Sequence, residues 1–380
     1  IPTVLMRGGT SKGLFFHDNH LPSDPDARNR VILTAFGSPD PNRRQIDGVG
    51  GGVSTTSKVA IISPSDSPDY DVVYNFGQVS IDRPIVDYKS NCGNISSAVG
   101  PFAIDEGLVR AVEPVTRVRI HQLNTNKLIT ADVPVKNGRF DEAGDYTIAG
   151  VPGTHARIAL GFANPGGALT GKLLPTGNRR DTVEIPDYGK VAITIIDAAN
   201  PVVLVRAEDI GLTGVEIDEV DASDAITTTL ETIRCKAAVL IGLAVSEEEA
   251  TQRSQAVPKI GFIAAPKPYT TTGGQTLTPH DIDIVGRIMS MGTLHRSYAV
   301  SGGIATAGAA MMPGTVAYDL VDDNARGNAP LRIGHPGGII DIGAVINADG
   351  DRYDYKEAVI GRTARRLMEG YVLVPEGCCG

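Results

Sequence analysis

The chain has 380 residues, of which 42% are hydrophobic, and a formal net charge of −9 at pH 7. This length exceeds that of one ordinary domain, so we expect two domains of similar size. The acidic balance and the absence of a basic run with interleaved aromatic residues exclude a nucleic-acid partner. No apolar window of about 18 residues and no leader-like start is present, so we expect a soluble, cytoplasmic protein without a membrane partner.

The cysteines argue against a metal centre. Cys92, Cys235, Cys378 and Cys379 are too few and too scattered for a disulfide framework or for a zinc site with CxxC spacing. We therefore expect no metal, and the role of the adjacent Cys378 and Cys379 stays open.

The N-terminal segment predicts two strands joined by a glycine turn. Residues 3–16 contain two apolar runs around Gly8 and Gly9, and Thr10 and Ser11 follow the turn as candidate anion contacts. The order GxxxxGK[ST] is absent, so nucleotide binding gains no support. Helical spacing then covers residues 24–36, and two prolines mark 37–44 as a loop.

Residues 46–60 contain a lysine at the entrance to an apolar strand. Four glycines and the hydroxyl residues 54–57 precede Lys58, and the apolar run 59–62 follows it. A lysine held there loses hydration, which disfavours its charged form and makes it a candidate proton acceptor. Ser57 would be a small donor beside it. The alternative is a surface lysine that happens to precede a strand.

A second candidate lies before a helix. Residues 70–81 alternate as a strand does, and the turn Asn91-Cys92-Gly93-Asn94 leads into residues 95–108, which predict a buried helix of small residues. The free N–H groups and dipole of a helix N-terminus favour a carboxylate, and they also favour a thiolate at Cys92. The alternative is a structural cysteine that packs as a small apolar residue.

An internal repeat relates the two halves of the chain. Residues 57–62 recur loosely as 258–263, residues 71–80 as 281–290, residues 91–98 as 300–307, and the pair 119–120 as 332–333, in the same order. The repeat predicts an α+β fold of two similar domains, 1–182 and 183–380, each a mixed sheet around a central helix. If the halves face each other, Lys58, Cys92 and Ser301 converge on one cleft suited to a substrate with several carboxylates. A purely structural duplication is the alternative.

Several motifs in one order resemble a known family. They are MRGGTSKG at 6–13, IDGVGGGVSTTSKVAI at 46–61, NCGNISSAVGPFAI at 91–104, GKLLPTGN at 171–178, VPKIGFIAAP at 257–266 and GHPGG at 334–338. Together they resemble the cofactor-independent allylic isomerases, a family that includes methylitaconate isomerase, methylaconitate isomerase and oxalomesaconate tautomerase and shares the diaminopimelate epimerase-like fold. The resemblance spans nearly the whole chain and is more specific for the family than for the substrate.

The resemblance implies a 1,3-proton shift in a small unsaturated di- or tricarboxylic acid, without a cofactor. In this family the position of Lys58 is the proton shuttle, so Lys58 is the expected general acid/base and Cys92 a second catalytic residue. The second cysteine of the epimerases corresponds to Ser301, too weak an acid and base for a two-thiol mechanism. The expected substrate contacts are Thr10, Ser11, Ser57, Asn91, Gly93, Asn94, His295, Ser301, Gly302 and Gly303.

Three other functions stay open at this point. They are an oxalomesaconate-type keto–enol tautomerase, a racemase or epimerase on the same fold, and a non-catalytic protein that binds a tricarboxylate. For His295 the alternative is a histidine satisfied by the backbone near a helix end. The sequence leaves open which acid is the substrate, whether the isomerisation is cis/trans or positional, and whether the chain forms a homo-oligomer.

Overall fold

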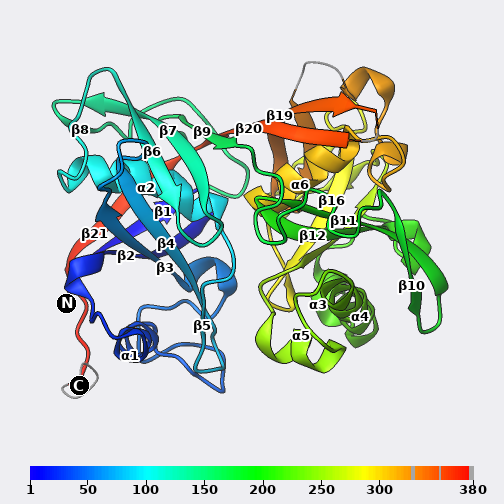
Figure 1. The fold of residues 1–380 in the computed structure, drawn as a ribbon, viewed down its shortest axis with the longest axis horizontal. Helices are drawn as coiled ribbons and strands as arrows, with labels where there is room; N and C mark the ends of the chain where they lie inside the picture. Colours follow the sequence, from blue (N-terminus) through cyan, green and yellow to red (C-terminus); the bar gives the residue numbers. More distant parts are fainter. Residues whose placement is uncertain (327–329, 351, 376–380) are drawn as a thin grey trace. The chain divides into compact units, whose positions relative to one another are not determined.

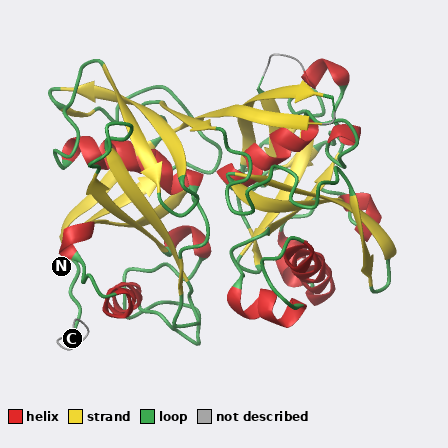
Figure 2. Cartoon of the chain, viewed as in Figure 1, coloured by secondary structure: helices red, strands yellow, loops and turns green. Residues whose placement is uncertain are grey.

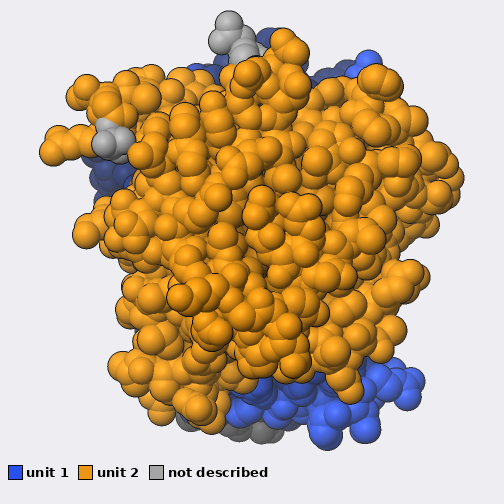
Figure 3. All heavy atoms as spheres, turned by 90° about the vertical axis from the view of Figure 1, so that its right-hand side faces the viewer, with its two compact units in different colours: residues 1–161, 361–380 blue, residues 162–360 orange. Residues whose placement is uncertain are grey.

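The computed structural model describes residues 1–326, 330–350 and 352–375, so Cys378 and Cys379 lie outside the described residues. The chain divides into two compact units (Figure 3). Unit 1 contains residues 1–161 and the segment from Gly361 onward, and unit 2 contains residues 162–360. Within the described residues, no helix is long and apolar enough to cross a membrane.

Unit 1 is a mixed sheet with two helices (Figure 1). Its strands are β1 (Pro2–Gly8), β2 (Ser11–His17), β3 (Lys58–Pro64), β4 (Val72–Val79), β5 (Val86–Asp87), β6 (Val115–Gln122), β7 (Lys127–Lys136), β8 (Arg139–Phe140) and β21 (Ala364–Tyr371). Its helices are α1 (Pro25–Phe36) and α2 (Gly93–Asp105), with short 3-10 turns η1 (Asp18–His20) and η2 (Ser54–Thr56). β9 (Ile158–Ala163) and β20 (Arg352–Arg362) contain the two points where the chain passes from one unit to the other.

The expected local elements of the N-terminal half are confirmed. The two strands around the glycine turn are β1 and β2, and the helix expected over 24–36 is α1. Asp24 caps α1 by accepting the Ala27 N–H at 2.8 Å, Pro25 occupies its first turn, and Gly37 ends it with a φ of 71°.

The central helix of unit 1 is α2. Every residue from Gly93 to Ile104 is buried, and strands β1, β2, β3, β6, β7 and β21 all pack against the helix (Figures 1 and 2). Small residues make this close approach possible: a Cβ atom on Gly100 would lie 2.7 Å from Cγ2 of Val133. α1 covers the opposite face of the sheet, where Val59 and Ile61 of β3 pack with Val31 and Phe36.

Unit 2 contains the remaining elements. Its strands are β10 (Asp181–Ile185), β11 (Gly189–Ala198), β12 (Asn200–Arg206), β13 (Lys259–Ala264), β14 (Tyr269–Thr270), β15 (Thr276–Leu277), β16 (Ile284–Ser290), β17 (Thr293–Leu294), β18 (Leu331–His335) and β19 (Gly338–Asp349). Its helices are α3 (Asp218–Ala222), α4 (Asp224–Leu240), α5 (Glu247–Arg253) and α6 (Val300–Ala310), with 3-10 turns η3 (Ala207–Ile210), η4 (Tyr318–Leu320) and η5 (Asp323–Arg326).

The topology of the sheets confirms the repeat. In unit 1 the order β1-β2-β3-β4-β6-β7 has antiparallel, parallel, antiparallel, parallel and antiparallel neighbours. In unit 2 the order β11-β12-β13-β16-β18-β19 has the same sequence of strand directions. α6 packs against β11, β12 and β19, as α2 does against its own strands. The predicted α+β fold of two similar units is therefore correct.

One ion pair is repeated with its contacts. In unit 1 the Arg119 guanidinium donates to both carboxylate oxygens of Asp71, at 3.3 and 2.8 Å, and its N–H donates to the same group at 2.7 Å. In unit 2 Arg332 makes the same three contacts with Asp283, at 3.2, 2.7 and 2.7 Å. In each unit the aspartate directly precedes a strand, β4 or β16, and the arginine lies on the parallel neighbour, β6 or β18, so the repeat extends to individual side chains.

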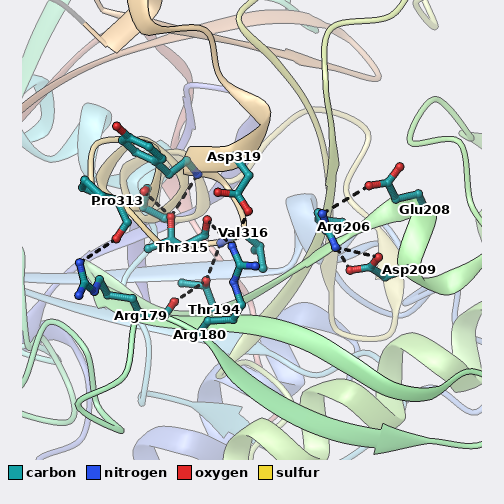
Figure 4. Close-up of polar contacts among 12 residues, drawn as sticks. Arg179, Arg180, Thr194, Arg206, Glu208, Asp209, Pro313, Thr315, Val316 and Asp319 are labelled. Atoms are coloured by element: carbon teal, nitrogen blue, oxygen red, sulfur yellow. Dashed lines mark hydrogen bonds and ion pairs between the residues drawn. The ribbon is translucent and has the colours of Figure 1, made fainter.

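The boundary between the units differs from the one expected at 182/183. Residues 162–182 lie in unit 2, where Arg179 donates to the Pro313 carbonyl at 3.1 Å and its own carbonyl accepts from Thr194 (Figure 4). Arg180 binds the Thr315 carbonyl at 3.2 Å in the same region. The motif at 171–178 also lies inside unit 2. The C-terminal segment belongs to unit 1 because β21 pairs with β1.

Candidate functional site

The strand register determines which way the Lys58 side chain points. Lys58 opens β3 and lies opposite Gly13 of β2 and Gln78 of β4. Because residues two apart in a strand face the same way, Lys58 shares a sheet face with Phe15, whose ring centroid is 5.8 Å from that of Phe102 in α2. Lys58 therefore faces the side of the sheet that α2 covers.

The first turn of α2 lies at the same end of the sheet as Lys58. A Cβ atom on Gly8 would lie 2.5 Å from the Asn94 carbonyl oxygen, whereas Phe102, near the other end of the helix, packs against Phe15 further along β2. Since β2 and β3 are parallel, the start of the helix and the start of β3 lie at one end of the sheet. The arrangement places the two predicted catalytic positions in one region of unit 1.

Lys58 is buried and has a neutral partner. Its side chain is 6% exposed, its amine donates to Oε1 of Gln78 at 2.6 Å, and it lies 5.3 Å from the centroid of the Phe76 ring. In the described part of the chain Lys58 forms no ion pair. The alternative of an exposed lysine before a strand is therefore wrong.

Gln78 connects the lysine to the loop before β3. Its Nε2 donates to the backbone carbonyls of Ser54 and Ser57, at 3.1 and 2.9 Å. Gln78 is itself 4% exposed, so these polar atoms are satisfied inside the protein.

A second glutamine organises the glycine loop. Gln45 is 1% exposed, and its Oε1 accepts from the Gly52 N–H at 2.9 Å and from the Ser57 hydroxyl at 2.7 Å. A Cβ atom on Gly50 would lie 2.3 Å from the Gln45 amide carbon, and Gly52 has a φ of 69°. The glycines thus let the loop close around Gln45. Ser57 is fully buried with its hydroxyl turned into this loop, and its role as a substrate contact stays a prediction.

Cys92 directly precedes α2, as expected. It is the N-cap residue with extended backbone angles, it is partly exposed, and its side chain makes no capping hydrogen bond. Tyr74 of β4 is buried close to it. Burial raises the pKa of Tyr74 well above its ordinary value, and the Cys92 thiol raises that pKa further.

The glycine turn between β1 and β2 is held on the start of α2. The Asn94 side-chain oxygen accepts the Thr10 N–H at 3.4 Å, and a Cβ atom on Gly9 would lie 2.2 Å from that oxygen. Gly9 also has a φ of 51°, which favours glycine. Next to it, Ser11 is 2% exposed and its hydroxyl is unpartnered in the part of the chain that the structure describes. An unpaired buried hydroxyl at this position is available to a ligand.

The helix start leaves N–H groups for an anion. The Ser96 N–H donates to the Cys92 carbonyl at 2.9 Å, so the first intrahelical bond begins there and the N–H groups of Gly93 and Asn94 precede it. Asn91 is buried and its Oδ1 accepts the Ser96 hydroxyl at 3.3 Å. Thr10, Ser11, Asn91, Gly93 and Asn94 are therefore gathered around the N-terminus of α2.

Unit 2 differs from unit 1 at the corresponding position. α6 begins at Val300, so Ser301 is its second residue and not its cap, and the Ser301 hydroxyl accepts from Asn200 Nδ2 at 3.1 Å. The Gly303 N–H already donates to the Ala299 carbonyl at 2.8 Å, which leaves Gly302 as the freer donor. A Cβ atom on Gly302 would lie 2.3 Å from Cδ1 of Ile288, so this glycine is also required for packing.

His295 follows the short strand β17 and is 6% exposed. Its Nδ1 accepts the Ser297 N–H at 3.2 Å, so the backbone satisfies one ring nitrogen, although no helix end lies there. Its role towards a substrate carboxylate stays a prediction.

Sequence reasoning missed three side chains in unit 1: Gln78, Phe76 and Tyr74. All three alternate along β4 on the α2 face, but only the antiparallel register of β3 and β4 reveals that they surround Lys58 and Cys92. A single polar residue near the end of an apolar strand was the one available signal for Gln78. Among the described residues, no group of three or more His, Cys, Asp or Glu side chains could hold a metal ion.

Comparisons with known proteins give consistent results. A family model described as PrpF protein matches residues 1–375. The chain is 47% identical over 376 residues to a 3-methylitaconate isomerase of Eubacterium barkeri, covering 98% of this chain and 97% of the relative. It is 40% identical over 388 residues to a 2-methyl-aconitate isomerase of Shewanella oneidensis, covering 99% and 97%. A crystal structure of methylitaconate-delta-isomerase superposes with a TM-score of 0.80 at 46% identity, covering 100% of this chain and 97% of the other.

Proposed function

The chain belongs to the PrpF protein family and is an isomerase, and from this premise we propose that it moves a C=C bond by a 1,3-proton shift in a small unsaturated di- or tricarboxylic acid. The proposed substrates are of the methylitaconate or methylaconitate type, the compounds after which its relatives are named. The observation that carries the mechanism is a buried lysine amine with a neutral partner, on the sheet face beside the start of α2.

Lys58 acts as general base and then as general acid. In its neutral form it takes the proton from the carbon that is both allylic and next to a carboxylate. The electron pair of that C–H bond spreads over the conjugated system as a dienolate. The Lys58 ammonium returns the proton to the carbon two positions away, which moves the double bond and regenerates the neutral amine. No atom is gained or lost by the substrate.

Groups around the start of α2 hold the carboxylates and the developing charge. The N–H groups of Gly93 and Asn94 point out of the first turn, where the helix dipole favours an anion. The unpartnered Ser11 hydroxyl supplies a further donor. Cys92 serves as a partly exposed contact next to these donors. In unit 2, Ser301, Gly302 and His295 remain the proposed further contacts.

Replacement of Lys58 by alanine tests this function. Loss of a positioned proton-transfer group typically costs about 10²–10⁴-fold in rate, and loss of the only base costs more. Because the helix N-terminus is unchanged, we expect the loss in kcat and little change in KM. The measurement is the ultraviolet change of the shifting double bond with methylitaconate and methylaconitate, and circular dichroism controls for folding.

A matched control is Lys259→Ala. Lys259 opens β13 as Lys58 opens β3, so the variant removes the lysine at the corresponding position of the repeat. We expect it to retain the wild-type kcat, whereas a racemase with a second base on unit 2 would lose activity. Exchange of allylic protons with deuterated solvent separates an isomerase from a non-catalytic binding protein. A Lys58→Ala enzyme with near-normal kcat and a raised KM would refute the mechanism.

A further inference from the structure

We propose that Gln78 is a positioning residue for Lys58: its side-chain oxygen directs the amine and supplies no negative charge. This inference rests on the proposed function, because it gives Gln78 a role only if Lys58 transfers protons. Gln78 does not need to contact the substrate to act in this way.

The surroundings of Gln78 determine the orientation of its amide. Nε2 has two hydrogens, and these donate to the carbonyls of Ser54 and Ser57 at 3.1 and 2.9 Å. A flipped amide would place its oxygen against two carbonyl oxygens and its NH2 group against the amine of Lys58. The oxygen of Gln78 is therefore committed to accepting from Lys58.

This contact suits both protonation states of a proton shuttle. A neutral amine has two N–H groups and an ammonium has three, so either form can donate to Oε1 of Gln78 at 2.6 Å. One N–H direction is then occupied, and the remaining positions on Nζ are directed away from Gln78. The Phe76 ring, with its centroid 5.3 Å from Nζ, further restricts where the amine can go.

The neutrality of the acceptor distinguishes Lys58 from Arg234, a buried cation that is held by a carboxylate. Arg234, which is 4% exposed, binds both carboxylate oxygens of Glu231 at 2.7 and 2.6 Å. A carboxylate within about 4–6 Å favours the charged form of a cation. An amide oxygen at the same distance accepts a hydrogen bond without holding the lysine in its ammonium form.

The other titratable groups come from the elements around β3. They are Tyr74 on β4, Asp87 on β5 opposite Gln78, Cys92 at the start of α2 and, at the end of β2 far from Lys58, His17, Asp18 and His20. His17 is bound to Glu106 at 3.0 Å, and the Asp87 carboxylate accepts the Lys89 N–H at 2.7 Å. None of these carboxylates replaces Gln78 as the partner of Lys58 in the described structure.

The experiment compares Gln78→Glu with wild type across pH. A carboxylate in place of the amide favours the Lys58 ammonium, so the acidic limb of the kcat profile should move about 1–3 pH units upward. On the acidic limb this corresponds to a fall of about 10- to 1000-fold in kcat at a fixed pH. Gln78→Met removes the acceptor without adding charge, so it should lower kcat about 10- to 100-fold and leave KM nearly unchanged.

The matched control is Gln122→Glu. Gln122 of β6 is fully buried, and its Oε1 accepts from the N–H and hydroxyl of Thr125, at 2.8 and 2.6 Å, in place of a lysine. The Gln122→Glu variant should have the same pH profile as wild type. A readout independent of turnover is the pH titration of the Lys58 ¹³Cε signal, identified by its absence in Lys58→Ala. That titration should move upward in Gln78→Glu and stay in place in Gln122→Glu.

The outcomes separate this inference from the proposed function. If Lys58→Ala is inactive while Gln78→Glu keeps the wild-type profile and titration, the role of Gln78 is refuted and that of Lys58 stands. If Lys58→Ala keeps the wild-type kcat, the role of Gln78 and the role of Lys58 are both refuted. Should Gln78→Glu not fold, Gln78→Met decides the question, since an unchanged kcat in that variant also refutes the role of Gln78.

Discussion

Replacement of Cys92 by serine should affect stability and catalysis in opposite directions. Cys92 has the extended backbone of an N-cap residue, and its thiol makes no capping bond. A serine hydroxyl is a preferred cap that accepts from an N–H of the first turn, worth about 1 kcal/mol relative to alanine. In a unit of this size, 1 kcal/mol corresponds to roughly 2–4 °C in Tm. We therefore expect a Tm equal to or a few degrees above that of wild type.

The same hydroxyl competes with the substrate. It accepts from an N–H group at Asn94 or Ile95, in the turn proposed to hold a carboxylate, so KM should rise. The C–H bond is still broken by Lys58, so kcat should fall less than in Lys58→Ala. Cys92→Ala is the control, because it removes the thiol without adding a cap and should lower Tm relative to the serine variant.

The assay combines ultraviolet kinetics with thermal melting of wild type and the three variants. The reasoning fails if Cys92→Ser is as inactive as Lys58→Ala while its Tm is unchanged or raised. That result would make the thiol itself an indispensable acid, since a folded helix with its N–H groups in place would then be insufficient for turnover.

Three further outcomes are expected. Arg332→Ala should lower the free energy of unfolding by about 1 kcal/mol, which the denaturant midpoint measures, because it leaves the Asp283 carboxylate, 9% exposed, without its cation; an unchanged midpoint would contradict it. Burial raises the pKa of Glu231, but the hydrogen bonds and charge of Arg234 outweigh it and leave that pKa lowered. The stabilisation by Glu231 is thus present above the unfolded pKa of about 4.3 and is lost as pH falls through the lower folded value, so Glu231→Gln should destabilise the protein most at pH 7 and progressively less as pH falls below about 4.3 in urea titrations. Gly9→Ala should lower kcat/KM and Tm together, since Gly9 has a φ of 51° and no room for a Cβ atom; wild-type kinetics in that variant would show that the turn does not position the site.

The local pattern of the sequence predicted the parts of the fold that depend on nearby residues. The ends of α1 are determined locally. The Asp24 side chain and Pro25 favour its start, and the backbone preference of Gly37 favours its end. The unbroken run of small and apolar residues after Gly93 predicted a buried helix, and α2 is buried on all sides. The repeat was readable because corresponding strands need the same alternation of apolar residues.

Other features depended on contacts between distant segments. The boundary between the units shifted because Arg179 and Arg180 bind the segment after α6, more than 130 residues away, and β21 returns to pair with β1. The start of α6 differs from that of α2 because Val300 is already helical, which uses the Gly303 N–H inside the helix. Neither difference has a local signature in the sequence.

By itself the sequence determined that Lys58 stands where a glycine loop enters a buried strand, and that Cys92 precedes a helix, because such patterns are local. Only the tertiary structure decided what the lysine contacts. Gln78 is 20 residues away and reaches Lys58 through the antiparallel register of β3 and β4, while its amide is oriented by the carbonyls of Ser54 and Ser57. A partner of this kind depends on strand pairing, and pairing is a property of the folded sheet as a whole.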